Sequence, residues 1–474
     1  MVNKFKYSVA KVLAKSSFYA LKVMPTGGKS FPGLLFIRLA GKESINKLSK
    51  DQVDFGSILI TGTNGKTSTT TMIIKMLSRD LDVSTSVENN TIYALATGLL
   101  RKRSQMGIFE YGIRDIEHGK PDQVCDMVDP IGVIYTNISR EHTQVAGVKN
   151  SFEDYVKAKT MLSQTMSNGI LITNADDPNT TYIGLNKESD NHLIYYGLEL
   201  DNLEDIFSQS NTKCPSCGSQ LKYEKHYINQ RGIYACDCGF KRPEPNVKVT
   251  KYIQNENSST VTIEVDAYNY HQKKNIQFTL DMQLHLTGIH NIYNSLTAIS
   301  TYTAFTTNKN IKESIIDFFK TYKFTVPPGR FEVLNIASKK IGVGQGDNGD
   351  ALKVNSNLFN SQANGEIEFI YTTPDELEEE IFEDHSLSIK AVNPSKLVVM
   401  PGRVSLDAAE KYYNQLKDDY NSKYVPVEFD FEARINKIVE LIQNSEYDNI
   451  LISGCGEEIV FWEELKKKIK NLNL

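Results

Sequence analysis

Apolar and polar positions alternate with two different periods along most of this chain. Between residue 51 and about residue 322, short apolar runs such as 57–60 precede stretches in which apolar residues recur every three or four positions, as in TTTMIIKMLSRDL. The first pattern is typical of buried strands and the second of amphipathic helices. Strands that alternate with helices predict an α/β fold built on a mostly parallel sheet with helices on both faces.

The same alternation resumes after residue 325 on a smaller scale. Strand-like EIEFIYT, KLVVMPG and NILISGCG alternate with helical SLDAAEKYYNQL, ARINKIVELIQ and FWEELKKKIK, which predicts a Rossmann-like α/β domain. The VPPGRFEVL segment before them predicts a rigid, extended linker, because proline restricts its own backbone and that of the preceding residue. We therefore predict a short N-terminal helical segment over 1–50, a central domain over 51–324 and a C-terminal domain over 325–474.

Residues 1–50 combine helical periodicity with basic charge. PTGGKSFPG separates YSVAKVLAKSSFYALKVM from FPGLLFIRLAGKESINKL, and Lys4, Lys6, Lys11 and Lys15 lie at the start of this segment. Two interpretations stay open at this point. The helices pack on the next domain, or their basic side lies on an anionic lipid surface.

The composition is that of a folded globular protein and excludes some partners. A chain of 474 residues is too long to fold around a single hydrophobic core. Its content of 40% hydrophobic and 23% charged residues is typical of soluble globular proteins. The net charge of −5 argues against binding nucleic acid through bulk electrostatics. The sequence has no run of about 18 apolar residues and no signal-peptide pattern, so it predicts a cytoplasmic protein that does not span a membrane.

The segment GTNGKTS, residues 62–68, lies between a predicted strand and a predicted helix. Such a loop turns backbone N–H groups and a helix N-terminus toward one point, where a triphosphate fits. Lys66 adds a positive charge, and the Thr67 hydroxyl suits Mg²⁺. The alternative is an ordinary glycine turn. The candidate nucleotide-binding residues of the loop are Gly62, Thr63, Asn64, Gly65, Lys66, Thr67 and Ser68.

Two more strands are predicted to end beside this loop. GIFEYG gives a strand that ends near Glu110, and IGVIYTN gives one that ends near Thr136, followed by His142. Functional side chains of α/β sheets gather at the carboxyl ends of the strands. Glu110 and His142 are therefore candidates for holding a metal bound to ATP, with a structural histidine as the alternative for His142.

The loop GTNGKTS has two residues between its glycines instead of the usual four, and it resembles the phosphate loop of the Mur ligase and folylpolyglutamate synthase superfamily. TNISREHTQVAG is similar to a second motif of this superfamily, which implies that His142 and Glu110 bind a second Mg²⁺. By the same resemblance, Lys159 in AKTML matches a lysine that many members carbamylate, Asn291 in LTGIHNIYNSLTAIS reaches the adenine, and Arg330 contacts the ATP phosphates after domain closure.

Other residues of the central domain have a plain interpretation beside the functional one. Lys159 also suits a solvated helix position, and Asp177 in NADDP suits an ordinary turn as well as the turn that lies beside the nucleotide in the superfamily. Asn294 lies three residues after Asn291 and therefore on the same helical face.

Four of the six cysteines form two close pairs, in CPSCG from Cys214 and in CDCG from Cys236. Each pair can present two sulfurs to one tetrahedral ion, and Gly218 and Gly239 relieve backbone strain after the ligands. The number and spacing of these cysteines fit a metal site in a reducing compartment better than a disulfide framework. The alternative is four free, buried cysteines. The predicted ligands of a structural zinc are Cys214, Cys217, Cys236 and Cys238.

A zinc ribbon inserted into a Mur-type ATPase resembles the MurT group and the archaeal pseudomurein peptide ligases. MurT is the ligase subunit of an enzyme that amidates peptidoglycan glutamate with ammonia from a glutaminase. The segment IGVGQGDNGDALKVN, interpreted as a loop, matches neither motif of these families and leaves Asp347 and Asn348 as candidates for ATP and substrate contacts. Asp375 could match the MurT aspartate, but the residues around it differ, and the acidic run 375–380 then indicates a solvated helix start.

The resemblance to Mur ligases implies an ATP-dependent ligase that phosphorylates a carboxylate and lets an amine attack the acyl phosphate, with ATP, Mg²⁺ and structural Zn²⁺ as cofactors. The main hypothesis is a peptide ligase that adds an amino acid to a UDP-linked or similar precursor of peptidoglycan or pseudomurein. The first alternative is a MurT-like subunit that works with a glutaminase to amidate the glutamate of lipid II. A folylpolyglutamate synthase conflicts with the zinc ribbon, and a nucleic-acid-binding NTPase conflicts with the net charge.

Overall fold

The computed structural model describes two compact units of the chain. The first contains 1–138, 152–204 and 210–324, and the second contains 139–151, 205–209 and 325–474. The described residues are 3–21, 30–87, 91–113, 116, 120–139, 144–145, 148–149, 152–201, 203, 212–255, 258–323, 326, 328–456 and 459–472.

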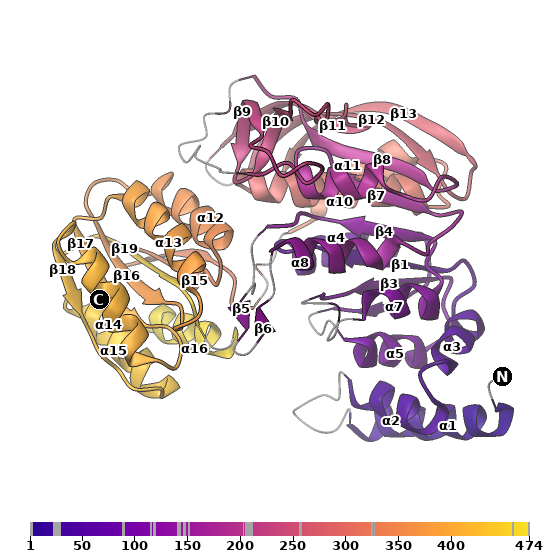
Figure 1. The fold of residues 1–474 in the computed structure, drawn as a ribbon, viewed down its shortest axis with the longest axis horizontal. Helices are drawn as coiled ribbons and strands as arrows, with labels where there is room; N and C mark the ends of the chain where they lie inside the picture. Colours follow the sequence, from indigo (N-terminus) through magenta and orange to yellow (C-terminus); the bar gives the residue numbers. More distant parts are fainter. Residues whose placement is uncertain are drawn as a thin grey trace. The chain divides into compact units, whose positions relative to one another are not determined.

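A nine-stranded sheet forms the centre of the first unit (Figure 1). Its order is β13-β12-β11-β8-β7-β4-β1-β3-β2, with parallel pairing from β2 to β11 and antiparallel pairing at β12 and β13. The predicted mostly parallel sheet is therefore confirmed. The strands are β1 (Ser57–Thr61), β2 (Val83–Ser86), β3 (Met106–Glu110), β4 (Gly132–Tyr135), β7 (Ile170–Asn174), β8 (His192–Leu198), β11 (Val247–Gln254), β12 (Ser259–Asn269) and β13 (Lys274–Leu284).

The central strands have continuous buried sequences, SILIT in β1, MGIFE in β3 and ILITN in β7. Strands that are covered by helices on both faces have such continuous apolar runs, because the side chains on both faces of the sheet are buried. The helices around the sheet are α4 (Lys66–Leu77), α5 (Ile92–Arg101), α7 (Pro121–Val128), α8 (Phe152–Thr160), the short 3₁₀ helix η1 (Met161–Ser163), α9 (Pro178–Leu185), α10 (Ile289–Phe305) and α11 (Ile311–Thr321).

Three helices at the start of the chain belong to the first unit: α1 (Lys4–Leu21), α2 (Phe31–Ala40) and α3 (Ser44–Gln52). Gly41 separates α2 from α3 with a backbone φ of 87°, a conformation that favours glycine. Tyr7, Ala10 and Ala14 of α1 are buried in one hydrophobic core with Leu95 of α5. The interpretation that these helices pack on the next domain is thus confirmed. Among the helices that the structure describes, none is long and apolar enough to cross a membrane.

A cysteine-containing insert lies between β8 and β11 of the first unit. It contains the antiparallel hairpin of β9 (Lys222–Ile228) and β10 (Arg231–Ala235). Its small core is formed by Cys214, Leu221, Tyr234, Cys236 and Phe240.

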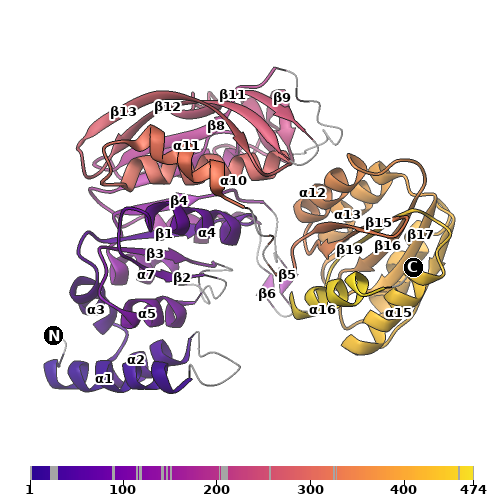
Figure 2. The same ribbon diagram turned by 180° about the vertical axis from the view of Figure 1, so that it is seen from behind.

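The second unit has a six-stranded sheet in the order β14-β15-β19-β16-β17-β18, parallel except for the β14–β15 pair. Figure 2 shows this unit from behind, with helices on both faces of the sheet. Each face has its own hydrophobic cluster, as the prediction of a Rossmann-like domain requires. The elements are β14 (Glu332–Ile336), β15 (Lys339–Gln345), α12 (Gly349–Asn360), β16 (Ile367–Thr373), α13 (Glu379–Val392), β17 (Lys396–Pro401), α14 (Leu406–Leu416), β18 (Ser422–Tyr424), α15 (Phe431–Gln443), β19 (Asn449–Gly454) and α16 (Ile459–Lys470), and the short strands β5 (Gln144–Val145) and β6 (Val148–Lys149) cluster with this unit.

The segment 341–355 is not the loop expected from its glycines. It forms the end of β15 and the start of α12, with a connection of only three residues, 346–348. A Cβ atom on Gly344 would lie 2.4 Å from the Cα of Phe331, and one on Gly342 would lie 2.6 Å from the Phe331 and Phe359 rings. Gly342 and Gly344 therefore allow β15 to pack closely against Phe331, just before β14, and against Phe359 of α12, and they do not mark a turn.

Candidate nucleotide and metal sites

The segment GTNG connects β1 to α4 at the carboxyl edge of the first sheet. Gly62 and Gly65 have φ values of 151° and 79°. A Cβ atom on Gly62 would lie 1.9 Å from Thr136 Oγ1, and one on Gly65 would lie 2.5 Å from Asn294 Oδ1. Both positions therefore require glycine. Gly65 also caps α4 without a side chain, so the first turn of the helix keeps N–H groups for an anionic ligand.

The end of β4 holds this loop in place. The backbone N–H of Thr63 donates to the carbonyl of Asn137 at 2.8 Å, and the N–H of Asn64 donates to Asn137 Oδ1 at 3.1 Å. The carbonyl of Asn64 accepts from Thr136 Oγ1 at 2.8 Å and from Asn137 Nδ2 at 2.9 Å. The Thr-Asn pair of the TNI motif thus fixes the loop backbone.

Thr67 and Glu110 meet at the carboxyl edge of the first sheet, beside the loop. Thr67 Oγ1 donates to Glu110 Oε1 at 3.0 Å, and Glu110 is only 2% exposed. Hydroxyl and carboxylate oxygens are hard ligands that suit Mg²⁺, so the residues present fit this ion. Lys66 lies on the same loop and donates from Nζ to the Thr63 carbonyl at 2.6 Å.

Lys159 lies behind the loop and is 1% exposed, so the interpretation as a solvated lysine is wrong. Its Nζ donates to the carbonyls of Gly62 at 3.0 Å and Ile113 at 3.3 Å. It also lies 4.6 Å from the ring centroid of Tyr155, whose hydroxyl is 3.1 Å from Thr63 Oγ1. The lysine therefore reaches the loop from α8, and its carbamylation stays a prediction.

The N-terminal part of α10 lies against the loop on another side. Thr69 Oγ1 donates to Asn294 Oδ1 at 3.1 Å, and Asn294 Nδ2 donates to Asn291 Oδ1 at 3.4 Å. Asn291 Nδ2 in turn donates to the Thr287 carbonyl at 2.8 Å. The structure thus brings Asn291, which the motif assigns to the adenine, to the phosphate loop through one intervening side chain.

Three of the predicted site residues are not part of this arrangement as described. His142 lies outside the described residues. Arg330 and Asp347 belong to the second unit. There, Asp347 Oδ1 accepts from the N–H of Gly456 at 3.0 Å and lies 3.8 Å from Arg403 Nη2.

Asn348 has a structural role in the second unit. Its Oδ1 accepts from the Ala351 N–H at 2.9 Å and caps α12, and the residue is 2% exposed. An asparagine cap satisfies one of the open N–H groups at the start of a helix. The contact of Asn348 with ATP or substrate stays a prediction.

The acidic run 375–380 is only partly a solvated helix start. Asp375 Oδ1 accepts from the N–H of Glu376 at 3.0 Å, while Glu378 Oε2 accepts from Arg403 Nε at 3.0 Å. The side chains of Glu378 and Arg403 are only 12% and 15% exposed. Glu378 therefore belongs to a shielded ion pair at the carboxyl edge of the second sheet.

Asp176 and Asp177 of the NADDP turn are both fully buried. Asp177 caps α9 through the N–H groups of Asn179 and Thr180, and it also accepts from the Ile138 N–H at 3.1 Å. Burial raises the pKa of Asp177 to about 6. The turn interpretation is therefore confirmed, and the same carboxylate ties α9 to the chain that follows β4.

The cysteine sulfurs have the geometry of a tetrahedral site. The four Sγ atoms of Cys214, Cys217, Cys236 and Cys238 lie within 4.8 Å of one another, with distances of 3.7 Å from Cys214 to Cys238 and 3.6 Å from Cys217 to Cys236. Zinc–sulfur bonds of about 2.3 Å give tetrahedron edges of about 3.8 Å. The donor set therefore fits zinc.

The backbone also forms two similar turns around the sulfurs. The N–H of Gly218 donates to the Cys214 carbonyl at 2.8 Å, and that of Gly239 to the Cys236 carbonyl at 3.0 Å. Both glycines have positive φ, 77° and 93°. The second turn thus keeps the knuckle geometry although one residue, not two, separates its cysteines.

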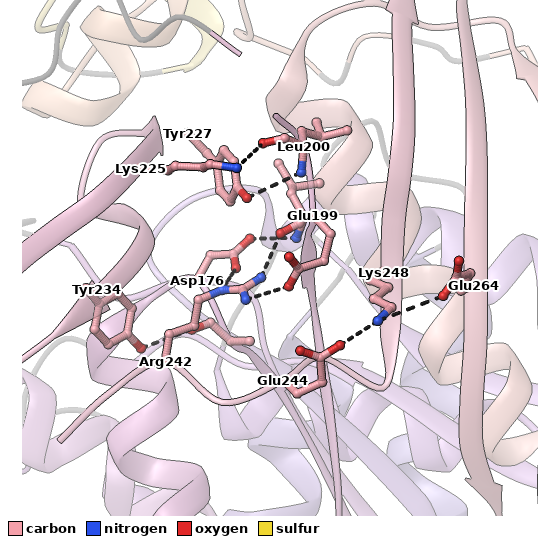
Figure 3. A network of polar contacts seen from close by, with 12 residues as sticks. Asp176, Glu199, Leu200, Lys225, Tyr227, Tyr234, Arg242, Glu244, Lys248 and Glu264 are labelled. Atoms are coloured by element: carbon pink, nitrogen blue, oxygen red, sulfur yellow. Dashed lines mark hydrogen bonds and ion pairs between the residues drawn. The ribbon is translucent and has the colours of Figure 1, made fainter. Parts of the chain in front are cut away.

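The sequence analysis did not identify several residues that connect the insert to the NADDP turn and to α10. Arg242 donates from Nε to Asp176 Oδ1, from Nη1 to Glu199 Oε1 and from Nη2 to the Leu198 carbonyl, each at 2.7 Å (Figure 3). Tyr293 of α10 donates to Asp176 Oδ2 at 2.7 Å. The signal in the sequence was weak, because Arg242 lies in KRPEP, which has the composition of a loop.

The hairpin makes further contacts with the same region. Gln230 Nε2 donates to Asp177 Oδ2 at 2.7 Å, and Tyr234 donates to the Ala175 carbonyl at 3.0 Å. Arg231, 5% exposed, lies with its guanidinium 4.8 Å from the ring centroid of Tyr293. Desolvation, with a smaller contribution from Arg231, lowers the pKa of His290 to about 4, so this imidazole is neutral at pH 7. The insert is thus joined to α10 and to the NADDP turn.

Comparisons with known proteins agree with these features. A family model described as the Mur ligase middle domain matches residues 60–238. The chain is 25% identical over 304 residues to the MurT subunit of the lipid II isoglutaminyl synthase of Streptococcus pneumoniae, a match that covers 62% of each chain. It is 28% identical over 247 residues to the corresponding Staphylococcus aureus subunit, covering 51% of this chain and 53% of that one.

A solved pseudomurein peptide ligase type C from Methanothermus fervidus matches with a TM-score of 0.68 and 25% identity, over 90% of this chain and 81% of that chain. The chain therefore resembles the Mur ligase superfamily in the sequence of its middle domain and in its fold. The resemblance drawn from the loop GTNGKTS is therefore confirmed, including its likeness to MurT. The matched stretches span between about half and two thirds of the MurT relatives, and the Mur ligase fold extends over both units of this chain.

Proposed function

We propose that this Mur-ligase-type chain is an ATP-dependent ligase that forms an amide bond in a cell-wall peptide precursor. The observation that carries the proposal is the Thr67–Glu110 contact at 3.0 Å, beside a loop whose two glycines cannot be replaced without collision. A hydroxyl at the start of a helix and a carboxylate at the end of the neighbouring strand can hold a metal ion on a bound triphosphate. An ordinary glycine turn has no need of this pair.

The reaction proposed is a substitution in two steps. A carboxylate oxygen of the precursor attacks the γ-phosphorus of ATP and ADP leaves; the amine then attacks the carbonyl carbon of the acyl phosphate, loses a proton and expels inorganic phosphate. Mg²⁺ would supply positive charge to the phosphate oxygens when bound. Lys66 and the first turn of α4 would hold the phosphates in line, which is the main protein contribution in phosphoryl transfer.

The remaining site residues keep the roles that the family motifs imply, as part of the proposal. Glu110 and His142 would hold the second Mg²⁺, and a carbamate on Lys159 would add negative charge near the loop. Asn291 would bind the adenine through its amide. Four thiolates leave no open zinc position, so Cys214, Cys217, Cys236 and Cys238 would stabilise the insert rather than take part in the reaction.

We also propose that the second unit closes on the first during the reaction and brings Arg330 and Asp347 to the nucleotide. The division into 1–50, 51–324 and 325–474 belongs to this proposal. The acceptor would be a UDP-linked or similar peptide in the cytoplasm, and an amino acid would be the amine. Nucleic acid has no part in this reaction.

The glutamine-dependent alternative is favoured by the MurT relatives, which are named as subunits of a glutamine-hydrolysing lipid II isoglutaminyl synthase. In that reaction a glutaminase partner would deliver ammonia to the acyl phosphate, and Asp375 would complete the partner's triad. Asp375 lies two residues after the end of β16, and its Oδ1 accepts from the N–H of Glu376. The surrounding sequence YTTPDELEEEIFEDH lacks the MurT pattern, so an amino acid remains the proposed amine.

The decisive experiment measures ADP release by the full chain with UDP-linked peptides and with each candidate amine, ammonia included. We expect turnover with an amino acid, no support from glutamine, and little change in the Asp375→Asn variant. Glutamine-driven turnover with a co-purifying glutaminase, lost in Asp375→Asn while ammonia still supports the reaction, would establish amidation instead. Turnover with folate and glutamate would establish the folylpolyglutamate alternative.

A further inference from the structure

The first part of the chain has a charge that is opposite to that of the whole protein. Residues 1–42 contain eight lysines and arginines, and Glu43 is the first acidic residue of the chain, although the net charge of the whole protein is −5. Helix α1 alone contains four lysines and no acidic side chain. Figures 1 and 2 show α1 and α2 together as the outermost layer of the first unit, beyond α5.

One side of α1 is fixed on the protein. Tyr7, Ala10 and Ala14 are at most 5% exposed, and the Tyr7 hydroxyl donates to Asp51 Oδ2 of α3 at 2.7 Å. The ring of Tyr7 also packs against that of Phe36 in α2, with centroids 5.8 Å apart. The rotation of α1 about its axis is therefore determined by these contacts.

The opposite side of α1 is apolar and open to solvent. Phe5 is 77% exposed, Val12 64% and Tyr19 63%, and Val9 and Leu13 are also exposed. With about 3.6 residues per turn, these five side chains fall on the side opposite to Tyr7, Ala10 and Ala14. Single exposed apolar residues need no explanation, but five on one helical face mark a site of interaction.

The lysines lie along the margins of this apolar face. Lys4, Lys11 and Lys15 follow one margin at helical spacing, and Lys6 lies on the other. Among the described residues, no ion pair involves Lys4, Lys6 or Lys15. A second copy of the same face would bring lysines against lysines, whereas an anionic bilayer presents hydrocarbon beneath negative headgroups. Charge complementarity therefore favours the bilayer.

We propose that α1 docks in the plane of an anionic lipid bilayer, with Phe5, Val9, Val12, Leu13 and Tyr19 inserted at the level of the headgroups and the lysines on the lipid phosphates. An amphipathic helix with a basic margin binds such surfaces through buried apolar area and electrostatic attraction together. The buried side of α1 would stay on the protein, so docking requires no unfolding. This inference does not depend on the ligase reaction proposed above.

The test is flotation of the full chain with vesicles of phosphatidylcholine alone or with about 30% phosphatidylglycerol. We expect binding to the anionic vesicles only, and release when NaCl rises from about 0.05 to about 0.5 M, because salt screens surface charge. Replacing Lys4 and Lys15 by Gln should weaken binding by about fivefold per lysine at low salt.

Two variants of the apolar face separate docking from folding defects. Val9→Asp with Val12→Asp should lower vesicle binding by about tenfold or more, while the matched surface variant Ile253→Asp, at a 62% exposed position of β11, should bind like the wild type. Val12→Trp should bind more tightly, because tryptophan favours the membrane interface. Its fluorescence should shift to the blue on vesicle addition, over the constant signal of the fully buried Trp462.

Equal binding to neutral and anionic vesicles, or full binding by the double aspartate variant, would overturn the proposal. So would a dimer in light scattering that the double variant dissociates, because the face would then contact a second copy. A Val12→Trp spectrum unchanged by anionic vesicles would exclude insertion even if the aspartate variant failed to fold.

Discussion

Replacing Arg242 by alanine should strongly destabilise the first unit, because it removes the positive charge that is paired with a buried carboxylate. The Arg242 side chain is 6% exposed and donates three hydrogen bonds of 2.7 Å, one of them to the fully buried Asp176 (Figure 3). Without it, Asp176 keeps the N–H of Leu198 and the hydroxyl of Tyr293 but loses its counter-charge. Removing one partner of a buried pair costs about 3 to 5 kcal/mol.

The cost should depend on pH, and its sign follows from Asp176. Burial raises the pKa of this carboxyl above its ordinary value, although the charge of Arg242 opposes the rise. Removing Arg242 therefore raises the pKa further. A carboxyl whose pKa is raised in the folded state contributes stability at low pH that is lost as the pH rises. The difference between variant and wild type should consequently be smallest near pH 4 and largest at neutral pH.

Amide hydrogen exchange of peptides from 170–200 and 231–250 measures this loss locally. A local measurement is needed because multi-domain proteins do not follow two-state unfolding. The control is Lys248→Ala, which removes the nearby Lys248 contacts with Glu244 and Glu264; Glu244 is 71% exposed and Glu264 49%. An exposed pair is worth about 1 kcal/mol or less. If Arg242→Ala resembles this control, or if its loss is equal at pH 5 and pH 7.5, the reasoning from a buried pair is refuted.

Three further variants test the candidate sites. Lys66→Ala should lower ATP turnover by about 10²- to 10³-fold without changing thermal stability, since the side chain only reaches back to the Thr63 carbonyl; full ADP release by the folded variant would contradict the loop assignment. Thr67→Val keeps the volume but removes the donor to Glu110, so turnover should require more Mg²⁺; an unchanged Mg²⁺ titration would contradict the metal role. Cys214→Ser with Cys217→Ser should release about one zinc per chain by mass spectrometry and increase exchange in 212–246, and zinc-free wild-type protein would exclude the ribbon.

The fold could be predicted because its signals are local. SILIT before GTNGKTS, and MGIFE ending at Glu110, show the period of buried strands, and parallel strands in one sheet bring their carboxyl ends together. The position of Glu110 beside the loop follows from this rule, whereas its hydrogen bond with Thr67 depends on side-chain positions that the sequence does not give. The prediction of a loop over 341–355 was wrong, because Gly342 and Gly344 allow close packing. The sequence does not distinguish such a glycine from one in a turn.

The parts of the site that could not be predicted depend on side chains far apart in the chain. Arg242 and Asp176 are separated by 66 positions and by the whole cysteine insert. Neither residue has a local pattern that selects the other. Lys159 was identified only through its family motif, because an amphipathic helix gives no sign that one lysine turns inward to the Gly62 carbonyl. Periodicity predicts which face is buried, but it does not predict a buried charge.

The contacts of the insert indicate what zinc bound by the four cysteines would do in a ligase whose proposed reaction does not use zinc. Gln230 and Arg242 reach from the insert to Asp177 and Asp176, and Tyr293 connects Asp176 to the helix that carries Asn291. A hairpin with so small a core has little folding energy of its own, so the metal would determine whether these contacts persist. We therefore expect zinc removal to weaken nucleotide binding through α10 and the NADDP turn while the phosphate loop itself, held by Thr136 and Asn137, stays folded.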